Sequence, residues 1–281
     1  GPKFPTVPPL SLLLRQTART KDVSHQEQVL LQLRTMAAGG IYDHLGGGFH
    51  RYSVDGQWLI PHFEKMLYDN AQLVRIYLDG WRLTKEKRLR EVVEETLEFV
   101  RRELTHPDGA FFAAQDADSE GHEGSYFVWE RAEIVAVLGV EKAEEFCRHY
   151  GVTESGNFEG KNVLNRLGRV QPEPDTQAEV EALLRPARAK LLAAREQRMK
   201  PQRDDNVLTS WNAMMVSAYL DAFLAFGIPA YLTAAEQALT FLLDYAVENG
   251  RVYRTVRGGG RAFERLPGRC GLSCRRVAGR V

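Results

Sequence analysis

GGIYDHLGGGFHRYSVDGQWLIPHFEKMLYDNAQL, which covers residues 39–73, joins two amphipathic helices through a segment with neither helical nor simple strand periodicity. The helix before it ends at Gly39 and carries a one-faced apolar stripe of Val29, Leu30, Leu33, Met36 and Ala37. The helix after it, with Asp69 as the expected N-cap, carries a second stripe of Ala71, Val74, Tyr77, Leu78 and Trp81. The quoted segment is therefore predicted to be an insertion between helices.

The same order of elements recurs along the chain. A one-faced apolar helix over residues 89–104 leads through THPDG into AFFAAQDADSEGHEGSYFVW, where two aromatic arms flank an acidic loop. Further helical stripes lie in residues 130–138, 211–226 and 231–246, and LLAAREQR closes another helix that Pro186 starts or kinks. We predict a mainly α protein of about seven or eight antiparallel helices with inserted β-hairpins.

The insertion of residues 39–73 is predicted to contain a β-hairpin, because Asp55-Gly56 separates the arms GFHRY and QWLIPHF. A two-residue turn would place His62 opposite Phe49, on the other face from His50. A three-residue turn would place both histidines on one face. The sequence leaves the two registers open.

The histidines of this hairpin have a functional and a structural interpretation. His50 and His62, with Glu64 and Tyr52 beside them, have the chemistry of general acids and bases. The alternative is that both imidazoles only fix the loop by hydrogen bonds. His44, close behind the end of a helix, is predicted to bind backbone carbonyls.

The second hairpin carries a dense acidic cluster, QDADSEGHEG. Asp116 and Asp118 share one face if the segment is extended, and such a pair suits acid and base work on a glycosidic bond or binding of sugar hydroxyls. Glu123 belongs to the same cluster. An EF-hand is excluded because Phe127 stands where the bidentate glutamate belongs. The structural alternative is a solvated hairpin tip.

A third polar cluster, RDDNVLTSWN, precedes the helix of residues 211–226. Asp205 near the helix start is explained equally well by the helix dipole and by a ligand contact. Trp211 begins the apolar stripe, so its ring is predicted either to pack in the core or to stack on a sugar.

Composition limits the class of protein. The 37 basic residues balance the 37 acidic residues, which argues against nucleic acid as a partner, and no apolar run reaches the roughly eighteen residues of a membrane span. Three scattered cysteines, Cys147, Cys270 and Cys274, do not form a disulfide framework. A reducing, cytoplasmic location is therefore expected.

Four long segments resemble one known family: residues 39–73, FFAAQDADSEG followed by YFVW, YGV followed by GNFEGKNVL, and DDNVLTSWNAMM. They are similar to the spermatogenesis-associated protein 20 family, also described as thioredoxin domain-containing proteins. The resemblance covers residues 2–257. It implies an (α/α) toroid like that of six-hairpin glycosidases and N-acylglucosamine 2-epimerases, here incomplete, and a thioredoxin-like domain that this chain lacks.

The resemblance also divides the chain. Residues 1–257 are predicted to be a partial six-hairpin glycosidase-like toroid. Residues 258–281, ending in ERLPGRCGLSCRRVAGRV, depart from the family pattern and are predicted to be an atypical tail, either disordered or produced by a frameshift.

These observations lead to two function hypotheses. The first is a carbohydrate-binding or carbohydrate-processing domain, epimerase-like or glycosidase-like, with a sugar as partner and with no metal or cofactor. The second is a non-catalytic scaffold or interaction domain. The catalytic candidates are His50 and His62, as the base and acid of an epimerase, and Asp116, Asp118 and Glu64, as the carboxyl groups of a hydrolase. The substrate-binding candidates are Tyr52, Trp58, Asp69, Asn70, Glu123, Asp205, Trp211 and Asn212.

Overall fold

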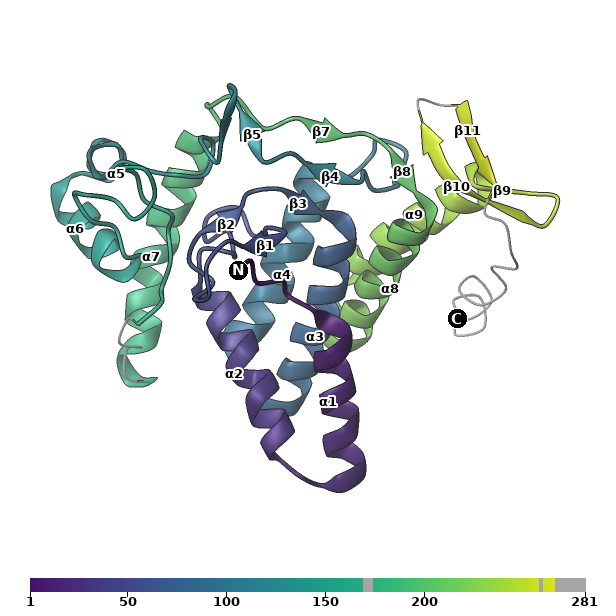
Figure 1. Ribbon diagram of the computed structural model, residues 1–281, viewed down its shortest axis with the longest axis horizontal. Helices are drawn as coiled ribbons and strands as arrows, with labels where there is room; N and C mark the ends of the chain where they lie inside the picture. Colours follow the sequence, from purple (N-terminus) through teal and green to yellow (C-terminus); the bar gives the residue numbers. More distant parts are fainter. Residues whose placement is uncertain (169–173, 258–259, 266–281) are drawn as a thin grey trace. The chain divides into compact units, whose positions relative to one another are not determined.

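The computed structural model describes residues 1–168, 174–257 and 260–265, and for residues 174–178, 257 and 260–265 it describes the backbone alone. Helices dominate the described chain (Figure 1), which confirms the mainly α prediction. The helices are α1 Val7–Thr20, α2 Ser24–Ala38, α3 Leu67–Thr84, α4 Lys87–Glu103, α5 Arg131–Leu138, α6 Val140–His149, α7 Pro174–Arg195, α8 Thr209–Phe226 and α9 Pro229–Tyr245. The strands are β1 Tyr52–Ser53, β2 Pro61–His62, β3 Lys65–Met66, β4 Ala114–Gln115, β5 Asp118–Ser119, β6 His122–Glu123, β7 Arg203–Asp204, β8 Val207–Leu208, β9 Val247–Glu248, β10 Arg251–Arg257 and β11 Gly260–Arg265.

The chain divides into two compact units. Unit 1 comprises residues 1–5, 23–64 and 116–202, and unit 2 comprises residues 6–22, 65–115 and 203–281. Unit 1 therefore contains α2, α5, α6 and α7, whereas unit 2 contains α1, α3, α4, α8 and α9. Each unit is assembled from segments that are distant in the sequence.

Unit 2 is built from pairs of antiparallel helices. Two residues, Lys85 and Glu86, join α3 to α4, and Gly227 and Ile228 join α8 to α9. The helices of each pair pack on one another, and α3 also packs on α8. Connections this short make packed neighbours antiparallel. Lys85 and Gly227 end their helices in the left-handed conformation, with φ of 59° and 68°. The predicted helix pairs are confirmed here.

Short strands lie between the helices of unit 2. β3, β4 and β7 form one antiparallel sheet, in which Lys65 pairs with Gln115 and Gln115 pairs with Arg203. β10 pairs with β8, β9 and β11. β10 thus gives an extended segment after α9, and β11 continues the pairing beyond residue 257.

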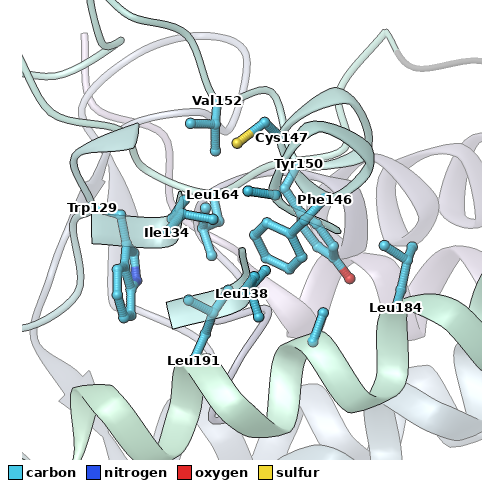
Figure 2. Close-up of a cluster of buried hydrophobic side chains, with 12 residues drawn as sticks. Trp129, Ile134, Leu138, Phe146, Cys147, Tyr150, Val152, Leu164, Leu184 and Leu191 are labelled. Carbon is cyan, nitrogen blue, oxygen red and sulfur yellow. The ribbon is translucent and has the colours of Figure 1, made fainter. Parts of the chain in front are cut away.

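Unit 1 has its own apolar core between α5, α6 and α7. Figure 2 shows its side chains converging from the three helices and from the irregular segment that follows α6. The labelled residues are Trp129, Ile134, Leu138, Phe146, Cys147, Tyr150, Val152, Leu164, Leu184 and Leu191. Pro186 lies inside α7, which begins at Pro174, so this proline does not start the helix.

The structure corrects several sequence predictions. Asp69 does not cap α3, because the helix already begins at Leu67 behind Met66 and Asp69 lies in its first turn. α1 was not expected: its N-terminal prolines suit the first turn of a helix, but it buries only Val7, so its burial pattern is weak. Residues 266–281, including Cys270 and Cys274, and residues 258–259 lie outside the described residues, so the prediction of a disordered or frameshifted tail stays a prediction there.

Candidate functional site

The hairpin of β1 and β2 has a wider loop than either predicted turn. Tyr52 pairs with His62 and Ser53 pairs with Pro61, so residues 54–60 form the loop. The Asp55 carboxylate organises this loop by accepting hydrogen bonds from the amides of residues 57, 59 and 60 at 2.5, 3.2 and 2.6 Å. Asp55 therefore acts as a loop-fixing acceptor, and the Asp55-Gly56 turn is wrong in both registers.

The observed register places an imidazole between an aromatic ring and two carboxylates. His62 lies opposite Tyr52, and their rings stack with centroids 4.9 Å apart. His62 Nδ1 is 2.7 Å from Glu123 Oε1, and Nε2 is 3.8 Å from Glu64 Oε2. Glu64 in turn accepts a hydrogen bond from Arg51 at 2.8 Å. We call these five residues the His62 site.

The geometry of the His62 site fixes which nitrogen can exchange a proton. With Nδ1–H donated to Glu123, the lone pair of the neutral imidazole is on Nε2. The side chain of His62 is 27% exposed, so this ring is accessible to a ligand. Glu123 also accepts the Phe63 amide at 3.3 Å, which fixes the carboxylate that orients the ring.

The acidic hairpin brings a further carboxylate to the same place. β5 and β6 pair so that Asp118 lies directly opposite Glu123. Directly opposed residues of an antiparallel ladder share a face and have Cβ atoms about 4.5–5.5 Å apart. Asp116 and Asp118 are exposed, whereas Ala117 and Ser119 are buried, so the alternation expected of an extended segment is present. Asp116 accepts the Ala117 amide at 2.7 Å.

The segment that follows α7 holds residues 125–128, directly after the acidic hairpin, in position. Arg198 donates to the carbonyls of Ser125, Tyr126 and Val128 at 3.4, 3.0 and 2.8 Å, and its guanidinium covers the Trp129 ring at 4.0 Å. Burial lowers the pKa of Arg198, and Glu133 opposes this effect. Sequence reasoning missed this contact because the donor and acceptors are some 70 residues apart.

His50 lies in a buried pocket that is organised by an ion pair. It is only 2% exposed, and its Nδ1 donates to the Phe63 carbonyl at 2.8 Å. Its ring meets Phe127 edge-on at 4.7 Å. The adjoining cavity has a volume of about 20 Å³, which suits a single water molecule. Among the histidines of the hairpin, His62 is thus the accessible one.

The ion pair beside His50 joins Asp43 to Arg195. Two hydrogen bonds of 2.9 and 2.8 Å connect them, and Asp43 also accepts the amides of Leu45 and Gly46 at 3.0 Å. Burial acts to lower the pKa of Arg195, but the charge and hydrogen bonds of Asp43 outweigh it and raise the pKa. The glycine-rich turn is therefore tied to α7. Nothing local in the sequence pointed to this pair.

His44, as predicted, binds a carbonyl, that of Gly39 at 2.9 Å.

Several other candidates occupy structural positions. Trp58 is fully buried in unit 1. In unit 2, Asn70 is fully buried and donates to the Met66 carbonyl at 2.9 Å. Asn212 is also fully buried, and it accepts the Phe111 amide at 2.7 Å while donating to the Phe111 carbonyl at 2.9 Å. These side chains hold the backbone or the core.

The remaining candidates of unit 2 are more accessible. Asp69 is half-buried in the first turn of α3. Trp211 is half-buried, and its ring packs against Tyr68 at 4.7 Å. Asp205 is exposed and pairs with Arg203 at 2.6 Å. These residues do not belong to the His62 site, which lies wholly in unit 1.

The described residues contain neither a group of metal-ligating side chains nor a helix suited to span a membrane. Within residues 1–168, 174–257 and 260–265, no three or more histidine, cysteine, aspartate or glutamate side chains are grouped so that they could hold a metal ion. In the same part of the chain, no helix combines the length and apolar character needed to cross a membrane.

Comparison with known sequences finds relatives over most of the chain. Spermatogenesis-associated protein 20 of Homo sapiens is 37% identical over 92% of this chain and 37% of its own length, and the Mus musculus protein is 35% identical over the same shares. An uncharacterized Caenorhabditis elegans protein is 34% identical over 91% of this chain and 40% of its own length. The chain thus spans well under half of these curated relatives. No protein-family model matches it.

Comparison with solved structures finds more distant likenesses. The α-1,6-mannanase GH76A of Salegentibacter sp. HEL1_6 is 12% identical with a TM-score of 0.46, over 86% of this chain and 47% of that protein. Cellobiose 2-epimerase of Spirochaeta thermophila is 15% identical with a TM-score of 0.36, over 95% of this chain and 80% of that protein. Likenesses of this strength carry no conclusion about activity.

Proposed function

Because this chain is homologous to spermatogenesis-associated protein 20 over 92% of its length, we propose that it is a carbohydrate-processing domain, part of an (α/α) toroid, whose acid and base is His62. The observation that carries the proposal is the hydrogen bond between His62 Nδ1 and Glu123, 2.7 Å long. It leaves Nε2 of a partly exposed imidazole to exchange protons.

The proposed reaction is epimerase-like. Nε2 of neutral His62 removes the proton alpha to the carbonyl of an open-chain sugar, and the resulting imidazolium is stabilised by Glu123 and by Glu64, 3.8 Å away. The planar enediolate then rotates about its C2–C3 bond, and the same imidazolium returns the proton to the opposite face of C2, so that the configuration inverts and His62 is again neutral. Tyr52 supports the ring by stacking. In this proposal Asp118, which lies opposite Glu123, accepts a sugar hydroxyl. His50, enclosed by aromatic rings, is left with a structural role.

A hydrolase-like reaction is the second candidate. Asp118 opposite Glu123 supports it, because glycosidases use two carboxyl groups that flank the scissile bond at about 5–10 Å. The engagement of Glu123 with His62 favours proton transfer at the imidazole instead. We therefore rank the hydrolase second.

Solvent exchange tests the leading proposal. The full chain is incubated in D₂O with reducing monosaccharides and disaccharides, and deuterium at C2 is followed by NMR together with any new epimer or hydrolysis product. His62→Gln is expected to slow C2 exchange at least about 100-fold, because a general base contributes at least that factor. His122→Gln is the matched control: this exposed neighbour of Glu123 pairs with Ser119 and faces away from Asp118.

The outcomes separate the hypotheses. C2 exchange that survives in His62→Gln as it does in the control would sink the assignment to His62. Disaccharide hydrolysis lost in Asp118→Asn, without C2 exchange, would favour the hydrolase. If neither reaction occurs with any sugar, the non-catalytic scaffold becomes the better description.

A further inference from the structure

A second cavity lies wholly within unit 2 and shares no residue with the His62 site. Its volume is about 240 Å³. The rings of Phe112 and Phe241 belong to a buried apolar cluster beneath it, and its polar lining residues are His106, Asp108, Asp205 and Tyr245. Pockets for drug-sized ligands usually exceed about 300 Å³, so this cavity suits a smaller molecule. We call it the His106 pocket.

The loop of the His106 pocket is fixed before any ligand arrives. The Gly109 amide donates to the His106 carbonyl at 2.8 Å, and Gly109 lies so close to Gln237 of α9 that an added Cβ would be 2.7 Å from the Gln237 Cβ. The His106 ring is held between Phe112 and Phe241, with centroids 5.2 and 5.3 Å away. A pre-formed site loses little entropy on binding.

The hydrogen bonds of the loop determine which donors and acceptors are available in the pocket. His106 Nδ1 accepts the Asp108 amide at 3.0 Å, so the proton of the neutral ring is on Nε2, which is a donor. Tyr245 is 40% exposed and adds a hydroxyl and an aromatic face beside Phe241. Asp108 and Asp205 supply acceptors, with Arg203 bound to Asp205. Donors, acceptors and an aromatic wall thus line one small cavity.

We propose that the His106 pocket binds one neutral polyhydroxylated ring of monosaccharide size. The C–H face of such a ring packs on Tyr245, while its hydroxyls bond to Asp108, Asp205 and His106 Nε2. A small organic cation would use the carboxylates and the aromatic face but would leave the donor Nε2–H without a partner. The proposal stands on the chemistry of this pocket and holds whether or not His62 transfers protons.

Ligand binding to the full chain tests the proposal. Titration calorimetry measures Kd for D-glucose, D-mannose, D-galactose and N-acetylglucosamine, with tetramethylammonium as the cationic probe. Asp108→Asn and Tyr245→Ala are each expected to raise Kd about fivefold, as loss of one hydrogen bond or one stacking contact does. Asp244→Asn changes an exposed carboxylate beside Tyr245 that does not line the pocket, so it is expected to leave Kd unchanged.

The result expected is saturable binding of at least one neutral sugar that weakens in both pocket variants and persists in Glu123→Gln, which disables the His62 site. Three results would overturn the proposal: binding of tetramethylammonium alone, sugar binding that both pocket variants leave unchanged, or no saturation by any probe. The same titrations are repeated with Glu123→Gln. Sugar binding that this variant abolishes belongs to the His62 site, and sugar binding that it leaves intact belongs elsewhere, so the two proposals fail separately.

Discussion

Asp43 and Arg195 form an ion pair in which the side chains are 4% and 3% exposed. Removing one partner of such a pair leaves an uncompensated buried charge. We therefore expect Arg195→Met to lower the free energy of unfolding by about 3–5 kcal/mol, as measured by urea denaturation at pH 7. The double variant Asp43→Asn/Arg195→Met should recover part of this loss, because it buries no lone charge.

The matched control for Arg195→Met is Arg101→Met. Arg101 pairs with Glu98 at 2.6 Å on the surface, where the two side chains are 64% and 49% exposed. Surface pairs contribute about 1 kcal/mol or less, so this variant should unfold nearly as the parent chain does. If both arginine variants lose the same free energy of unfolding, the Asp43 charge is compensated by other groups, and the prediction is wrong.

Cys147 provides a second prediction at the residue scale. Burial raises the pKa of its thiol, and Arg131 opposes this effect only in part. A raised pKa lowers the thiolate fraction, so alkylation by iodoacetamide at pH 8 should be slower in the folded chain than in urea. Peptide mass spectrometry measures the rate at Cys147 separately from Cys270 and Cys274. Equal rates in both conditions would contradict the burial seen here.

The same shift affects stability at high pH. Because the folded pKa is raised, the folded chain holds the thiol proton more tightly than the unfolded chain does. The stabilising contribution is complete below the unfolded pKa and is lost as pH rises through the folded pKa. Thus the Cys147 contribution to the free energy of unfolding should fall at alkaline pH, and Cys147→Ala should remove that part of the pH dependence.

At the scale of elements, the β5–β6 hairpin has two left-handed glycines with different surroundings. Gly121 lies in its turn, and Gly124 lies directly after β6. Gly124 has φ of 75°, and a Cβ there would lie 2.4 Å from the Phe63 ring, whereas Gly121 has φ of 78° and nothing within 4 Å. Both Ala substitutions carry backbone strain of about 1–2 kcal/mol. Gly124→Ala adds a clash with the buried Phe63 and should cost about 1–3 kcal/mol more.

The glycine pair also tests how the His62 site is held. Gly124→Ala is expected to displace Glu123 from His62 Nδ1 and so to change the chemical shifts of the His62 ring in NMR, whereas Gly121→Ala should leave those shifts as they are. Denaturation curves of both variants give the difference in stability. If the two alanine variants are equally stable and have the same His62 signals, Phe63 does not restrain the hairpin.

The elements themselves were largely predictable from sequence, because helical stripes and aromatic arms are local patterns. α3, α8 and α9 followed from apolar periodicity, and a hairpin was predicted in each insertion. The strands of the second hairpin, Asp118–Ser119 and His122–Glu123, lie within the acidic loop and not in its aromatic arms. The register of the first hairpin was not predictable. It depends on Asp55 accepting three amides within its own loop, and an Asp-Gly pair resembles a tight turn just as well.

At the scale of the whole molecule, the information missing from local patterns is long-range pairing. Arg195 meets Asp43 across 152 residues, and Glu123 meets His62 across 61 residues. Spacing and periodicity do not encode such partners, so the sequence predicted His62 and Glu123 as separate candidates without joining them. The division into two units was not predictable for the same reason, since each unit is assembled from three segments that are distant in the sequence.

Because unit 2 is built from separate segments, we expect a fragment that lacks the last segment to lose stability in the others. A chain ending at residue 202 retains every segment of unit 1 but lacks α8, against which α3 packs, and β7, which pairs with β4. Residues 67–103, which form α3 and α4, should therefore lose hydrogen-exchange protection by at least about tenfold relative to the full chain, as measured by mass spectrometry. A fragment of residues 1–257 keeps α8, β7 and the β8–β10 pairing and serves as the control, with near-parental protection expected. Full protection of residues 67–103 in the shorter fragment would mean that the α3–α4 pair is stable without its neighbours, contrary to the packing of unit 2.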